Sequence, residues 1–177
     1  ISIHLLFPIS SKYNCWRELA GAFFCVEGDT QAVEVFVPLL RGLGLQVQTI
    51  SPESKAQYHL SCALASNFVC ALVQRSAELL SGCGFSETDA LHALAPLMRS
   101  NLAHVIEHGA VSALTGPIER GDTQTVQKHL SCLTERDDRQ LYALLGLEQV
   151  KMAQEKHPEQ DYGTLAALLN REKEQKE

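Results

Sequence analysis

The sequence predicts a mainly helical protein in which a partial α/β segment precedes a helical domain. Two observations lead to this prediction. Before Ser51-Pro52, apolar runs of strand length surround a single helical pattern. After it, the apolar residues recur at helical spacing and no convincing strand pattern follows. We therefore place a first domain at residues 1–52 and a second at residues 53–177.

The first domain is expected to contain three strands and one helix. The helix covers residues 31–43, with Asp29 or Thr30 as its cap and Gly44 at its end. A strand, helix and strand at this spacing predict parallel pairing of the last two strands. Three strands are few for a covered sheet, and the chain begins at Ile1 inside an apolar run, so we expect a fragment of a longer protein. The expected strands are residues 2–7, 22–27 and 45–50.

The second domain shows five helical patterns. Ser86, followed three residues later by Asp89, resembles a capping box at the start of the second helix. Pro96 is expected to break that helix, and the charged run 171–177 is expected to fray. The expected helices are residues 53–81, 86–108, 123–133, 138–154 and 162–170.

Composition excludes several classes of function. The chain has 177 residues, of which 45% are hydrophobic, so it can bury a core. Its net charge is −6, and its Lys and Arg residues are scattered, so no nucleic-acid partner is expected. Polar residues interrupt the apolar runs before they reach the length of a membrane span, so no membrane contact is expected.

The cysteines and histidines predict no metal centre. None of the six cysteines forms a C-x-x-C pair, and Cys62 and Cys70 lie in apolar helical sequence that predicts buried thiols. A reduced, cytoplasmic chain is therefore expected. His104 and His108 have helical i,i+4 spacing and His92 lies nearby, but no further ligand has a suitable spacing for zinc.

A polar stripe marks the first helix of the second domain. Lys55, His59, Ala63 and Asn67 are spaced four residues apart, so they share one helix face, and Ser66 lies beside them. The stripe offers a cation, an amide and an imidazole that can exchange a proton near neutral pH. The same residues also fit hydrogen bonding and close packing within a helix bundle, and both interpretations stay open.

The loop at residues 114–122, Leu-Thr-Gly-Pro-Ile-Glu-Arg-Gly-Asp, is more polar than a turn requires. Gly116 and Gly121 permit backbone angles that other residues avoid, and the proline between them fixes its own. Asp122 is placed to cap the next helix. The remaining Thr, Glu and Arg predict a binding function, and a plain connection with a solvated Arg is the alternative.

Three segments together resemble a known family. They are K-A-Q-Y-H with A-S-N at residues 55–59 and 65–67, A-L-T-G-P-I-E-R-G-D at 113–122, and K-H-L at 128–130. The chain resembles the Rossmann-like proteins that carry a C-terminal "domain of unknown function 2520". These are similar to 6-phosphogluconate dehydrogenase, pyrroline-5-carboxylate reductase and prephenate dehydrogenase. Residues 2–5 resemble the family's S-x-H-P stretch, with Leu5 where Pro is usual.

The resemblance implies a two-domain oxidoreductase that uses NADP or NAD. The helical domain would be similar to the C-terminal domain of 6-phosphogluconate dehydrogenase, forming the substrate side of the cleft and a homodimer interface. A Gly-rich turn from strand to helix, which holds the pyrophosphate, is absent from this sequence. We therefore expect no tight cofactor binding by this chain alone.

The resemblance also assigns roles to individual residues. We expect the catalytic and substrate-binding side chains to converge on one cleft that accepts a small anionic substrate, because a guanidinium pairs well with a carboxylate. The alternative is a non-catalytic helical dimerisation or ligand-binding module. The assigned residues are Lys55, His59 and Asn67 for catalysis, Ser66, Thr115 and Arg120 for the substrate, and His4 for the cofactor.

Overall fold

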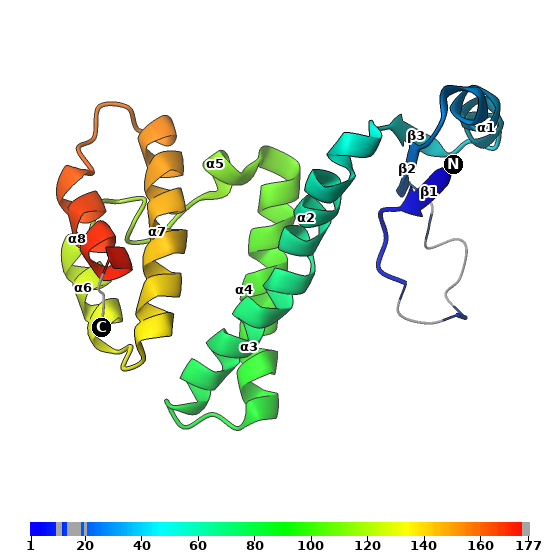
Figure 1. Cartoon of the computed structure of the whole chain (residues 1–177). Coiled ribbons are helices and arrows are strands. Elements are labelled where there is room, and N and C mark those ends of the chain that lie inside the picture. The colour runs from blue at the N-terminus through cyan, green and yellow to red at the C-terminus, as the bar shows by residue number, and fades with distance from the viewer. Residues whose placement is uncertain (10–11, 14–18, 20, 175–177) are drawn as a thin grey trace. The chain divides into compact units, whose positions relative to one another are not determined.

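The computed structural model describes residues 1–9, 12–13, 19 and 21–174. The described chain is mainly helical and has one small sheet, as the sequence predicts (Figure 1). It divides into two compact units, which we call the first unit (Ile1–Ala90) and the second unit (Leu91–Glu177). The last strand ends at Thr49, before the predicted domain boundary, and the first unit continues beyond that boundary to include two helices.

The sheet contains β1 (Ser2–Leu5), β2 (Phe23–Glu27) and β3 (Gln46–Thr49), in that order. β2 and β3 are parallel and are joined through α1 (Thr30–Gly42), which confirms the predicted pairing. β1 runs antiparallel to β2. The Asp29 carboxylate caps α1 by accepting a hydrogen bond from the backbone N–H of Ala32 at 2.9 Å.

The sheet separates a small core from a polar face, because successive side chains of a strand point to opposite sides. Val26 of β2 and Val47 of β3 pack with Val37 of α1 in the core of the first unit. The other face is polar, and it is the face on which the candidate site lies. It carries Ser2 opposite Glu27 and His4 opposite Cys25.

A short 3-10 turn, η2 (Pro52–Ser54), leads into α2 (Lys55–Ala65) and α3 (Asn67–Ser81). The prediction of one continuous helix over residues 53–81 is wrong at Ser66. The backbone there has φ −125° and ψ −73°, outside the α-helical range. Ser and Asn side chains compete for backbone hydrogen bonds and disfavour helix interiors, which explains a break at this pair.

The stretch Pro52–Ser81 is long and apolar enough to cross a membrane, judged by length and composition alone. The sequence interpretation expected no such stretch. Its apolar side chains are exposed within the chain, as at Leu60, Leu64 and Phe68. A single stretch of this kind is weak evidence for a membrane span, because the core helix of a globular protein meets the same test.

The helices that follow are α4 (Glu87–His108), α5 (Ala110–Ala113), α6 (Thr123–Ser131), α7 (Arg136–Lys156) and α8 (Gly163–Glu174). The predicted capping box starts α4. Ser86 Oγ accepts from the Asp89 N–H at 3.1 Å and donates to Asp89 Oδ2 at 2.7 Å.

The predicted break at Pro96 is wrong, because α4 continues through it. A proline within a helix removes one backbone hydrogen bond, and the neighbouring bonds hold this helix together.

The core of the second unit joins three helices and the polar loop, and α7 lies along α8 (Figure 1). The predicted fraying of residues 171–177 is wrong for residues 171–174, which are helical. Glu172 is buried and accepts hydrogen bonds from Arg139 Nε at 2.8 Å and Nη2 at 2.7 Å. Residues 175–177 lie outside the described chain. The buried core residues are Ile118, Val126, Leu130, Ala143, Ala153, Tyr162, Leu165 and Leu169.

The cysteines differ in exposure. Cys25 is buried, Cys62 is half-buried and Cys70 is exposed. The prediction of a buried thiol is therefore wrong for Cys70, because no element of the described chain covers that part of α3. The five cysteines in the described residues are free thiols, and Cys15 lies outside those residues.

Candidate functional site

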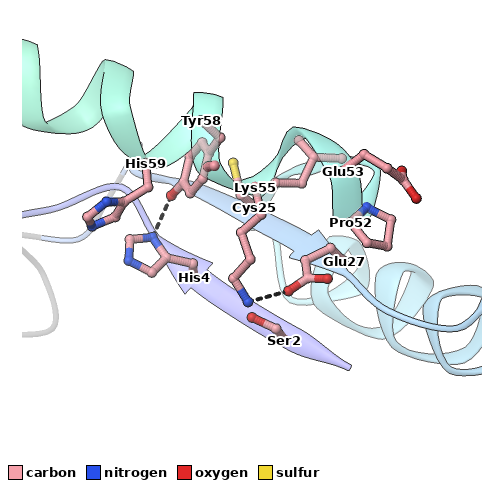
Figure 2. Close-up of a pocket in the computed structure, with 11 residues that line it drawn as sticks. Ser2, His4, Cys25, Glu27, Pro52, Glu53, Lys55, Tyr58 and His59 are labelled. Atoms are coloured by element: carbon pink, nitrogen blue, oxygen red, sulfur yellow. Dashed lines mark hydrogen bonds and ion pairs between the residues drawn. The ribbon is translucent and has the colours of Figure 1, made fainter.

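A cavity of about 440 Å³ lies over the polar face of the sheet, beneath η2 and the first turns of α2 (Figure 2). It reaches the carboxyl ends of the parallel strands, because Glu27 ends β2 and Ile50 follows β3. Crevices at the carboxyl ends of parallel strands are the usual ligand sites of open α/β sheets. The lining residues are Ser2, His4, Cys25, Glu27, Ile50, Pro52, Glu53, Lys55, Ala56, Tyr58 and His59.

A second cavity of about 380 Å³ adjoins the first, and His4 and His59 line both. The predicted residues Ser66 and Asn67 lie in this second cavity, at the break between α2 and α3. The two imidazoles thus stand where the cavities meet. The other lining residues are Leu5, Leu6, Phe7, Pro8, Cys62, Ala63 and Ala65.

An ion pair lies in the first cavity. Lys55 Nζ donates to Glu27 Oε1 at 2.5 Å, and 14% of the Glu27 side chain is exposed against 58% of Lys55 (Figure 2). The hydrogen bond from Lys55 lowers the pKa of the Glu27 carboxyl, although desolvation opposes it. Lys55, predicted to be catalytic, is thereby held as a fixed positive charge beside the cavity.

Tyr58 connects the strands to α2. Its hydroxyl hydrogen-bonds Nδ1 of His4, and the two rings meet edge to face with centroids 5.4 Å apart (Figure 2). Burial raises the pKa of Tyr58, and interactions with Cys25 and Cys62 raise it further. Burial likewise raises the pKa of the Cys25 thiol. The Tyr58 hydroxyl and the Cys25 thiol are therefore neutral at physiological pH.

Five of the seven predicted site residues lie at these two cavities. Thr115 and Arg120 belong to the second unit, and their convergence with His59 stays a prediction. Sequence reasoning missed Tyr58 and Glu27. Tyr58 directly precedes His59 in the K-A-Q-Y-H segment, and Glu27 ends a predicted strand. Their positions in the sequence therefore could have indicated that both residues lie near the site.

The polar loop folds onto its own unit. Gly116 has φ +106° and Gly121 has φ +70°, so both use the freedom that the sequence predicted for them. Asp122 caps α6, with Oδ1 accepting from the Thr125 N–H at 3.0 Å and Oδ2 accepting from the Thr125 hydroxyl at 2.6 Å. Ile118 is buried in the core of this unit.

Glu119 anchors the loop to the end of α7. Its Oε1 accepts from His157 Nε2 at 2.6 Å and lies 3.5 Å from Lys156 Nζ, while its backbone carbonyl accepts from the Tyr162 hydroxyl at 2.6 Å. The hydrogen bond from His157 is the main cause that lowers the Glu119 pKa. Thr115 and Arg120 are exposed, so the anchored loop presents these two side chains to solvent.

No group of three or more His, Cys, Asp or Glu side chains in the described residues is arranged to hold a metal ion. His104 and His108, at the predicted helical spacing, stack edge to face with ring centroids 4.5 Å apart. His108 Nδ1 faces the backbone carbonyl of His104 at 3.3 Å.

Comparison with known proteins identifies the family. Residues 22–149, most of the chain, match the family described as domain of unknown function (DUF2520). The chain belongs to the DUF2520 family. The crystal structure of protein TM1727 from Thermotoga maritima is similar to the DUF2520 chain, with a TM-score of 0.56 and 24% sequence identity over 97% of this chain and 60% of TM1727. The DUF2520 chain therefore spans 60% of the length of TM1727. No curated protein matches it.

Proposed function

We propose that the DUF2520 chain is part of an NAD(P)-dependent oxidoreductase and forms the substrate side of its cleft. The observation that carries the proposal is the cavity at the carboxyl ends of β2 and β3, where His4 and His59 meet the Lys55–Glu27 ion pair. A concave site with a few convergent polar groups is the expected form of a small-molecule site. Its place at the carboxyl ends of the parallel strands matches that of ligand sites in open α/β folds.

The side chains suit proton transfer at a carbonyl, imine or hydroxyl group. An imidazole titrates near neutral pH, so His59 can give or take the proton that accompanies oxidation or reduction. Lys55 supplies a positive field, and Ser66 and Asn67 offer hydrogen bonds in the adjoining cavity. We propose that Thr115 and Arg120 bind the anionic group of the substrate from the polar loop.

The cofactor in this proposal is NADP or NAD, which supplies or accepts a hydride when bound. The described residues do not fit its pyrophosphate. In the turn from β2 to α1 the Asp29 carboxylate already accepts from the helix N-terminus, at 2.9 Å from the Ala32 nitrogen, and a carboxylate there repels a phosphate. We therefore propose that residues outside this chain hold the pyrophosphate and that His4 lies on the nicotinamide side.

We further propose that the protein is a homodimer. Many apolar side chains of the helices are exposed within the chain, including 67% of Leu97, 51% of Leu144 and 54% of Phe68. Large apolar side chains left exposed in this number favour burial against another protein surface. A dimer is therefore expected in sedimentation at tens of micromolar, and a clean monomer would contradict it.

The free thiols of the described cysteines suit a reducing cytoplasm, where we propose that the protein acts.

Calorimetry on the complete gene product and on this chain tests the proposed function. We expect the complete protein to bind NADPH or NADH with micromolar affinity and this chain to bind neither. Micromolar binding to this chain alone would show that the pyrophosphate site has been misplaced. Failure of the complete protein to bind either nucleotide would support the dimerisation-module alternative.

A further inference from the structure

We propose that Tyr58 fixes His4 as a hydrogen-bond donor, with the Nε2–H of His4 directed to an oxygen atom of the substrate. This inference rests on the proposed function and assigns different roles to the two histidines of the site. His59 would transfer the proton, whereas His4 would bind and polarise the carbonyl or carboxylate oxygen. Tyr58 is then a positioning residue that acts through His4.

The two histidines differ in how they are held. His4 Nδ1 is hydrogen-bonded by the Tyr58 hydroxyl, and the edge-to-face contact of the rings restrains the imidazole plane (Figure 2). His59 makes no hydrogen bond with any other residue that the structure describes. A restrained imidazole keeps one orientation and one tautomer, while an unrestrained one is free to gain and lose a proton.

Chemistry decides the direction of the hydrogen bond between Tyr58 and His4. The hydroxyl has one hydrogen, and its neighbours are the imidazole Nδ1 and the thiols of Cys25 and Cys62. A thiol is a weak acceptor and a weak donor, whereas an unprotonated imidazole nitrogen is a strong acceptor. The Tyr58 hydroxyl therefore donates to Nδ1 of His4. The proton of neutral His4 must then reside on Nε2.

The position of His4 makes this donor useful. His4 lines both cavities, and its side chain is exposed within the chain while Tyr58 is half-buried behind it. A neutral N–H donor whose orientation is fixed before the substrate arrives stabilises negative charge that develops on an oxygen atom. The sequence interpretation gave His4 a cofactor-binding role, so this inference assigns it a substrate contact instead.

Nitrogen NMR of the histidine rings in the ¹⁵N-labelled chain tests the orientation without any activity assay. We expect His4 to show one tautomer, with Nε2 protonated and Nδ1 unprotonated. Tyr58→Phe should shift both His4 nitrogen signals towards a mixture of tautomers. Tyr142→Phe is the matched control, because the Tyr142 hydroxyl lies 2.9 Å from His129 Nδ1 in the second unit. It should alter His129 and leave His4 unchanged. A His4 protonated on Nδ1, or a Tyr58→Phe chain with unchanged His4 signals, would overturn the proposal.

Kinetics of the complete protein separate a donor from a proton-transfer group. His4→Leu removes the donor and should lower kcat/KM about a hundredfold, as for other fixed donors to an oxyanion. His4→Gln keeps an N–H group and should recover most of that loss. Equal losses in the two variants would show that His4 transfers a proton and would overturn the donor role. Failure of the unmodified complete protein to bind NADPH or NADH would instead refute the proposed function, and the NMR result would stand.

Discussion

The first and second units each contain a cluster of His, Tyr, Lys and Glu side chains, and the two clusters differ in what surrounds them. Around Glu119 in the second unit, the partners hold a loop against a core of eight buried residues. Around His4 in the first unit, the partners line a cavity above a sheet whose core has three buried residues. The same chemical groups therefore fix the chain in one unit and line a cavity in the other.

The difference between the two units should be largest when a residue of their hydrophobic cores is truncated. Leu169 is fully buried among the helices of the second unit, so Leu169→Ala should lower the free energy of unfolding by about 3 kcal/mol. Val26→Ala in the core of the first unit removes fewer buried carbon atoms and should cost about 2 kcal/mol. Hydrogen exchange can follow each unit separately. We expect Leu169→Ala to destabilise the second unit more than the first, and equal destabilisation of both units would contradict this prediction.

Removal of His59, the proposed proton-transfer group, should have the next largest effect. In the complete protein, His59→Ala should lower kcat about a hundredfold, as loss of a general acid or base does, without changing the thermal midpoint. His108→Ala is the control, because its ring contacts residues of its own helix, the His104 carbonyl and ring and the Glu107 carboxylate, and its loss should not affect the rate. An unchanged rate in His59→Ala would remove His59 from the chemistry.

Arg120 should affect substrate affinity and leave folding unchanged. Its side chain is exposed and makes no hydrogen bond or ion pair within the described chain, so Arg120→Ala should leave stability intact. Loss of one charge-assisted contact should raise KM for a carboxylate substrate about tenfold. Arg171→Ala, an exposed Arg on α8, controls for the change in net charge. A loss of stability in Arg120→Ala would make the loop residue structural.

Glu119 should have the smallest effect, and that effect should depend on pH. Glu119→Gln weakens the contacts to His157 and Lys156 and should lower stability by about 1 kcal/mol. Because the folded pKa lies below the ordinary value of 4.5, this stability is complete above pH 4.5 and is lost as the pH falls further. Urea unfolding at several pH values measures the difference. Glu148→Gln, in an exposed ion pair with Lys151, is the matched control. A pH-independent difference would contradict the ionic role.

Local patterns were enough to predict most of the elements, although the short helix α5 was not predicted. The apolar runs and caps at Asp29, Ser86 and Asp122 placed most strands and helices, because each signal lies within a few residues of the structure it specifies. Proline positions misled, since the helix through Pro96 loses only one hydrogen bond there. The break at Ser66 was missed, because apolar spacing continues through it.

The contacts of the site were less predictable than its residues. His4 and Tyr58 are 54 residues apart, and Lys55 and Glu27 are 28 apart, so no local pattern connects them. The polar loop shows the same limit, because Glu119 bonds to a residue 38 positions further along the chain. Its polar composition suggested a site, yet Ile118, Glu119 and Asp122 hold the loop in place, and Thr115 and Arg120 remain exposed.

The most direct test is a titration of the complete protein, ¹⁵N-labelled at histidine, with NADP or NAD. We propose that His4 and His59 of the first unit face the ligands, whereas His129 and His157 of the second unit hold the chain. We predict that the ring signals of His4 and His59 shift on binding and that those of His129 and His157 stay in place. Shifts confined to His129 and His157, with His4 and His59 unchanged, would contradict the account.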